Sequence, residues 1–168
     1  MNNGEKYKVA FRLTNGSSSG LTFLEDYLYN NPKVDVAFIR SIYMLLSYNV
    51  ELFLKSRVVM CGSFLSEDDL KKKLINLSHN LIKIKKELGD AELLKIGVKE
   101  INKSDTLYII KTTSDIEIKI EDFIDIRYDY LFGKMRLIAG EEHTEIMKYL
   151  KELFKILKFV EKYNEQTE

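Results

Sequence analysis

The sequence predicts a mainly α-helical protein, an up-and-down helical bundle with a small inserted β-hairpin around residues 106–120. The chain of 168 residues contains one proline and eight glycines. These residues are the least favourable in helix interiors, so their scarcity favours long helices. Apolar residues recur at helical spacing over two long segments, 35–60 and 141–163. Clean alternation of apolar and polar residues, which is typical of a strand, occurs near residue 118.

The first 34 residues predict a lead-in segment with a short helix. Residues 5–13 fit either a helix or a strand, and 14–20 (TNGSSSG) have the composition of a loop. Residues 21–29 predict a short helix that ends before Pro32, because the residue before a proline avoids helical geometry. We therefore divide the chain into this lead-in, a helical domain over 35–163 and a frayed tail over 164–168.

The first half of the helical domain predicts a long helix over 35–60 and several shorter ones. Gly62 is a plausible stop for the long helix. Ser66 precedes three acidic residues and predicts the N-cap of the next helix. Ser78 is expected to cap a further helix that ends at Gly89, and 91–96 fit another short helix.

The second half predicts a β-hairpin between helices. Residues 106–112 and 116–120 are rich in β-branched residues and flank the turn sequence Thr-Ser-Asp. An isolated hairpin is only marginally stable, so we expect it to pack on the helices. Residues 121–131 regain helical periodicity. The last helix, 141–163, has a clear apolar stripe formed by Ile146, Leu150, Leu153, Leu157 and Val160.

Composition excludes several classes of protein. The 26 basic and 26 acidic residues balance, which argues against holding nucleic acid mainly by overall positive charge. A local basic patch is still available at Lys71, Lys72, Lys73, Lys83, Lys85 and Lys86. The single Cys61 excludes an internal disulfide and fits a reducing cytoplasm. We expect no secretory signal and no membrane span.

No cofactor or metal ion is expected from the sequence. Cys61, His79 and His143 lack the spacing of metal ligands. The chain also contains no P-loop and no Gly-x-Gly-x-x-Gly phosphate-binding motif.

One row of polar residues interrupts the apolar helix over 35–60. Ser47, Glu51 and Lys55 are spaced four apart and therefore share one stripe. Charged groups are costly to bury unless they are paired. The row predicts either an intrahelical Glu51–Lys55 ion pair or a buried polar contact with Arg127 or His79 that lines a cleft.

Three short motifs, in this order, resemble the HEPN family of small helical domains from prokaryotic defence, toxin–antitoxin and nucleotide-related systems. They are Val50–Lys55 (VELFLK), His79-Asn80-Leu81 and Arg127-Tyr128. The resemblance covers 35–163. It implies an up-and-down helical bundle that forms a homodimer, with RNA or a nucleotide as ligand and a nucleotidyltransferase as partner protein.

The same resemblance implies a candidate catalytic pair, Arg136 and His143. Catalytic members carry an arginine, four to six residues and then a histidine, and six residues separate these two. Gly140 lies between them, and Leu137 replaces the usual polar residue. In metal-independent RNA cleavage, a histidine can accept the 2′-hydroxyl proton while an arginine stabilises the phosphate charge. The alternative is a surface arginine and a first-turn histidine among glutamates.

The remaining candidates are binding residues. Arg127 can contact a phosphate and Tyr128 can stack on a base, or Arg127 can form a structural ion pair with Glu51. His79 can act as an acid, a base or a ligand, or can simply hydrogen-bond at a helix start. The first interpretation is a non-catalytic or regulatory HEPN-like module that associates with RNA, a nucleotide or a partner protein. The alternatives are a metal-independent endoribonuclease and a structural helical dimerisation scaffold.

Overall fold

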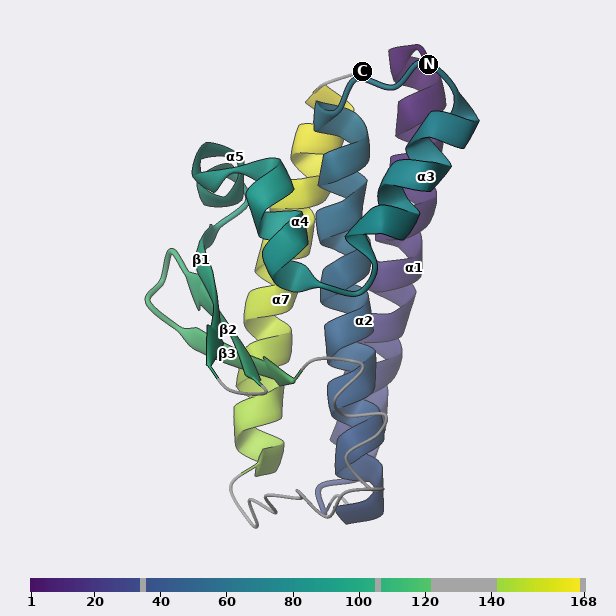
Figure 1. The fold of residues 1–168 in the computed structure, drawn as a ribbon. Coiled ribbons are helices and arrows are strands. Elements are labelled where there is room, and N and C mark those ends of the chain that lie inside the picture. The colour runs from purple at the N-terminus through teal and green to yellow at the C-terminus, as the bar shows by residue number, and fades with distance from the viewer. Residues whose placement is uncertain (34–35, 105–106, 122–141, 167–168) are drawn as a thin grey trace.

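The computed structural model describes residues 1–33, 36–104, 107–121 and 142–166. Three long helices run side by side and contact one another (Figure 1): α1 (Asn3–Asn30), α2 (Val36–Cys61) and α7 (Glu142–Gln166). Three short helices follow α2: α3 (Glu67–Leu77), α4 (Leu81–Leu88) and α5 (Asp90–Lys95). A small antiparallel sheet comes next, with strands β1 (Val98–Ser104), β2 (Leu107–Thr112) and β3 (Glu117–Glu121). The protein is therefore mainly helical with a small sheet, as predicted.

The prediction of a loop over residues 14–20 is wrong, because these residues continue one helix of 28 residues, α1. Thr14 and Ser17 are buried, and their hydroxyls donate to the carbonyl oxygens of Ala10 (3.2 Å) and Asn49 (3.0 Å). The hydroxyl of Thr14 is thus satisfied within α1, whereas that of Ser17 joins α1 to α2. α1 is thus a full member of the bundle rather than a short lead-in helix.

Two glycines of α1 face α2 at different distances. A Cβ atom added at Gly20 would lie 2.3 Å from Oδ1 of Asn49, well inside van der Waals contact. A Cβ at Gly16 would lie 3.5 Å from Cδ1 of Leu52, which is an ordinary contact. Glycine at position 20 therefore allows the two helices to approach closely.

The capping residues predicted for the short helices are partly confirmed. Ser66 caps α3, since its Oγ accepts a hydrogen bond from the amide of Asp69 at 3.2 Å. The prediction of Ser78 as the cap of α4 is wrong. Asn80 takes that role, and its Oδ1 accepts from the amide of Lys83 at 3.0 Å. α4 ends as expected at Gly89, whose φ of +75° suits glycine.

The predicted hairpin is present as β2 and β3, with Tyr108 opposite Ile120 and Ile110 opposite Ile118. All four of these side chains are buried and belong to the main core. The sequence did not predict β1, which pairs with β2 on the other side. The sheet contacts α2 through β3 and α4 through β1, so it packs on the helices as expected.

The last helix, α7, is predicted correctly, and all five residues of its apolar stripe are buried. The frayed tail is wrong for Asn164, which lies inside α7 with 2% of its surface exposed. The predicted helix over 121–131 falls almost wholly outside the described residues. No helix within the described ranges is long and apolar enough to cross a bilayer.

Candidate functional site

Three of the predicted binding residues, Glu51, Lys55 and His79, are joined through the carboxylate of Glu51. Its side chain is buried on α2, with 4% of the residue exposed. Its Oε1 lies 2.6 Å from Nζ of Lys55, one turn further along the helix. Its Oε2 lies 2.7 Å from Nδ1 of His79, which precedes α4. The structure therefore contains both contacts that the sequence offered for Glu51 as alternatives, the intrahelical pair and the contact with His79.

Lys55 and His79 line one wall of a groove of about 800 Å³. The groove lies between α1, α2 and α3. Its basic residues are Arg12 and Lys71 in addition to Lys55, and Glu67 and Asp68 are its acidic residues. Its apolar lining is Val9, Leu70, Leu74 and Ile75. The volume is within the range of roughly 300–1,000 Å³ that is typical of small-molecule sites.

The Glu51–His79 contact fixes the orientation of the imidazole ring. When Nδ1 carries the proton and donates to Glu51, the neutral ring has its acceptor at Nε2. The side chain of His79 is 42% exposed, so the ring is accessible from the groove. A buried carboxylate behind a partly exposed imidazole is an arrangement that can accept a proton from a bound ligand.

Only one member of the predicted catalytic pair, His143, lies within the described residues. His143 lies in the first turn of α7, where its Nε2 lies 2.8 Å from the carbonyl oxygen of Leu28, near the end of α1. This contact ties two long helices together. Arg136, Arg127 and Tyr128 all lie outside the described residues, so the Arg136–His143 and Glu51–Arg127 pairs stay predictions.

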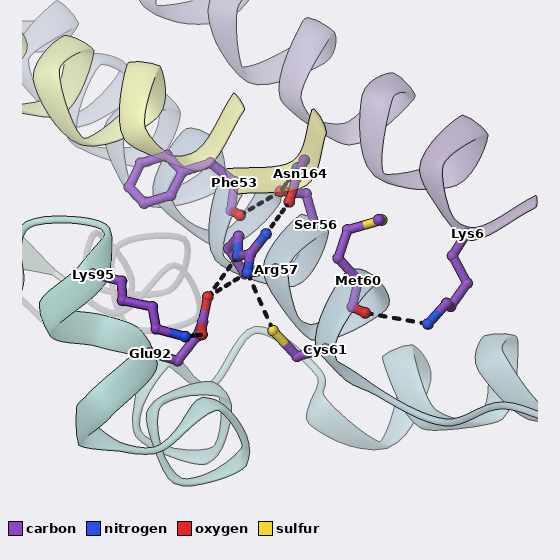
Figure 2. A network of polar contacts seen from close by, with 9 residues as sticks. All are labelled: Lys6, Phe53, Ser56, Arg57, Met60, Cys61, Glu92, Lys95 and Asn164. Carbon is purple, nitrogen blue, oxygen red and sulfur yellow. Dashed lines mark hydrogen bonds and ion pairs between the residues drawn. The ribbon is translucent and has the colours of Figure 1, made fainter. Parts of the chain in front are cut away.

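A second polar cluster, centred on Arg57, was not predicted from the sequence (Figure 2). Arg57 is 3% exposed and lies between α5 and α7. Its Nε donates to Oε1 of Glu92 at 2.9 Å, and its Nη2 contacts the same oxygen. Its Nη1 donates to Oδ1 of Asn164 at 2.7 Å, and Nδ2 of Asn164 donates to Ser56 at 3.2 Å. The cluster joins three helices through one guanidinium group.

Two groups at this cluster, Glu92 and Cys61, have pKa values shifted in opposite directions. Burial alone would raise the pKa of Glu92, but the hydrogen bonds and charge of Arg57, with those of Lys95, lower it below its usual value. Burial raises the pKa of the Cys61 thiol, and the charge of Arg57 opposes that shift only in part. Because the thiolate is the reactive form, the raised pKa makes Cys61 a poor nucleophile.

A weak signal for Arg57 was present in the sequence. It stands among Val58, Val59 and Met60, and a charge in an apolar helix end indicates a buried partner. Its partners Glu92 and Asn164 lie far away along the chain, so local spacing does not reveal them.

Neither a metal site nor a known relative points to another function. Within the residues that the structure describes, no three His, Cys, Asp or Glu side chains gather closely enough to hold a metal ion. Comparisons with protein-family models, curated proteins and solved structures give no match to this chain. The groove beside Glu51 is the candidate site because it combines a buried carboxylate, two groups held by that carboxylate and a concave surface.

Proposed function

We propose that the protein is a regulatory module that binds a nucleotide, either free or as part of an RNA chain, in the groove between α1, α2 and α3. The observation that carries the proposal is the buried Glu51, which holds Lys55 and His79 together at the groove wall. Arg12 and Lys71 add two further cations from α1 and α3.

The mixed lining of the groove matches the mixed chemistry of a nucleotide. Cationic side chains form charge-assisted hydrogen bonds to phosphate oxygens. Glu67 and Asp68 can accept hydrogen bonds from ribose hydroxyls, and the apolar residues offer surface to a base. A ligand with only one of these features would leave part of the lining unmatched. The zero net charge fits a local site better than a long nucleic-acid track.

Exchanging one lysine of the groove tests this proposal. We expect Lys71→Glu to weaken binding of adenosine 5′-monophosphate about tenfold, because it replaces a charge-assisted hydrogen bond with repulsion. Lys72→Glu changes the net charge equally on the same helix but does not line the groove, so it should leave the affinity within about twofold of the wild type. Isothermal titration calorimetry gives both dissociation constants.

Two further ligands identify what the groove binds. Adenosine lacks the phosphate, so Lys71→Glu should not alter its binding. A six-nucleotide single-stranded RNA distinguishes a free nucleotide from an RNA chain as the ligand. If the wild type binds neither the monophosphate nor the RNA, the proposal is wrong and the structural dimerisation scaffold becomes the better interpretation.

The HEPN relationship, the homodimer and the nucleotidyltransferase partner also belong to this proposal. They are carried by the sequence motifs alone, at Glu51, His79 and Arg127-Tyr128. Sedimentation of the purified chain measures the dimer directly.

A second candidate function is a metal-independent endoribonuclease, and the Glu51–His79 geometry favours it. In this reaction Nε2 of His79 takes the proton of a ribose 2′-hydroxyl while the 2′-oxygen bonds to phosphorus. The bond from phosphorus to the 5′-oxygen breaks, and that oxygen takes a proton from water. His79 then releases its proton to water. Lys55 stabilises the charge on the phosphate.

Incubation of the protein with single-stranded RNA in EDTA tests this second candidate and locates its site. We expect His79→Ala to reduce cleavage at least a hundredfold, the usual contribution of a general base, and His143→Ala to retain it. Circular dichroism checks that both variants are folded, because His143 also joins α7 to α1. If cleavage is lost instead in His143→Ala and Arg136→Ala, catalysis belongs to the pair predicted from the sequence. If the wild type leaves the RNA intact, the endoribonuclease function is wrong.

A further inference from the structure

Ser78 has a backbone conformation that serine rarely adopts. It follows the last turn of α3 with φ of +51° and ψ of −143°. This region of backbone space is populated mainly by glycine, and strained residues there cluster at functional sites. Within the described ranges, the other non-glycine residue with positive φ is Asp115, in the turn before β3. Asp is one of the residues that tolerate positive φ, so Asp115 has an ordinary explanation.

The fold does not use the side chain of Ser78 as a helix cap. The amide of Ser78 donates to the carbonyl oxygen of Ile75 at 2.9 Å, which any residue could do. The capping of α4, which a serine here could provide, is performed by Asn80. Glycine would therefore serve the backbone better at this position, and the presence of serine needs another reason.

The position of Ser78 supplies that reason. Ser78 is exposed, lines the groove and immediately precedes His79, which Glu51 holds in place. Lys71, which belongs to α3, lines the groove as well. A hydroxyl, an imidazole and an ammonium group thus border the same space. The hydroxyl and the ammonium group donate hydrogen bonds to phosphate oxygens, and the acceptor nitrogen of the neutral imidazole can accept one from a ribose hydroxyl.

We propose that Ser78 is a ligand-binding residue whose hydroxyl donates to the phosphate of the nucleotide in the groove. This inference rests on the nucleotide-binding function proposed above and assigns the phosphate end of the ligand to the Ser78–His79 loop. The strained backbone keeps the loop in the binding conformation before the ligand arrives, which reduces the ordering that binding requires.

Two variants of Ser78 distinguish the effect of its hydroxyl on binding from the effect of its backbone strain. Ser78→Ala removes the hydroxyl and keeps the strain, and we expect it to weaken binding of adenosine 5′-monophosphate about fivefold without raising the melting temperature. Ser78→Gly removes both. It should weaken binding at least as much and raise the melting temperature by about 3–8 °C. Neither variant should change the affinity for adenosine, which has no phosphate.

Asp115→Gly is the matched control, because it places glycine at the other positive-φ position, far from the groove lining. It should leave the affinity for the monophosphate unchanged. If the wild type binds the monophosphate and both Ser78 variants bind it equally well, this inference is overturned and the proposed function stands. If only Ser78→Gly loses affinity, the hydroxyl contact is overturned. Absence of binding by the wild type overturns the proposed function and this inference together.

Discussion

Replacement of Arg57 by leucine should lower the free energy of unfolding by about 3 kcal/mol. Removing one member of a buried ion pair typically costs about 3–5 kcal/mol, because the other charge is left buried without its partner. The lower end applies because Lys95 still lies 3.2 Å from Oε2 of Glu92. Asn164 and Ser56 also lose an ordered neighbour. Urea unfolding followed by circular dichroism measures the change.

A surface ion pair provides the control for Arg57. Lys73 and Glu87 lie 2.6 Å apart, and about a third of each side chain is exposed. Lys73→Leu should therefore change the free energy of unfolding by less than about 1 kcal/mol. The double variant Arg57→Leu/Glu92→Leu should recover part of the stability lost by Arg57→Leu, since no unpaired carboxylate is left. Equal effects of Arg57→Leu and Lys73→Leu would contradict the assigned role of Arg57.

The same cluster makes the stability depend on pH. The folded pKa of Glu92 is lowered, so its carboxylate contributes stability above the unfolded pKa. That contribution is lost as the pH falls through the lowered folded pKa. The wild type should therefore lose stability on acidification more steeply than the double variant, when both are followed by urea unfolding at a series of pH values.

Alanine at Gly20 and at Gly16 should change stability in opposite directions. The Cβ of Gly20→Ala would meet the amide group of Asn49, which is 1% exposed and is held by a hydrogen bond from its Nδ2 to the carbonyl of Leu45 at 2.6 Å. Such overpacking costs about 1–3 kcal/mol and exceeds the gain in helix propensity. Gly16→Ala has room, so it should stabilise by about 0.5–1 kcal/mol.

Thermal and urea unfolding of the two variants show whether close packing or helix propensity determines the effect of alanine at each position. The double variant Gly20→Ala/Asn49→Ala removes the obstructing amide, so the two substitutions should be less damaging together than their separate effects predict. If Gly20→Ala stabilises the protein as Gly16→Ala does, α1 and α2 do not approach as closely as the structure shows.

The sequence predicted helices correctly where local residue spacing alone determines the buried face or the cap. The stripe from Ile146 to Val160 and the cap at Ser66 follow from local spacing, and both are present. Thr14 and Ser17 gave the wrong result because small polar residues are common in loops. In the structure the hydroxyl of Thr14 donates within α1 and that of Ser17 donates to α2, so both are satisfied inside a helix. β1 was missed because its two buried residues, Val98 and Ile101, are three positions apart instead of two, and the other residues of the strand are charged or polar.

The candidate site was predictable only where its members share a helix. The spacing of Glu51 and Lys55 indicated their ion pair directly. The order of the motifs singled out His79, but only the folded chain shows that it contacts Glu51. The groove, the strain at Ser78 and the Arg57 cluster depend on segments that are distant in sequence. Residue spacing along the chain does not predict contacts between such distant segments.

Lys55 and Arg57 lie two residues apart on α2 and serve opposite sides of it. Lys55 belongs to the groove, all of whose lining residues come from 9–79, whereas Arg57 is tied to Glu92 and Asn164 in the second half of the chain. Substitutions on one side need not disturb the other. Over evolutionary time such a scaffold can acquire a new ligand specificity while keeping its interior unchanged, and a protein engineer could re-line the groove in the same way.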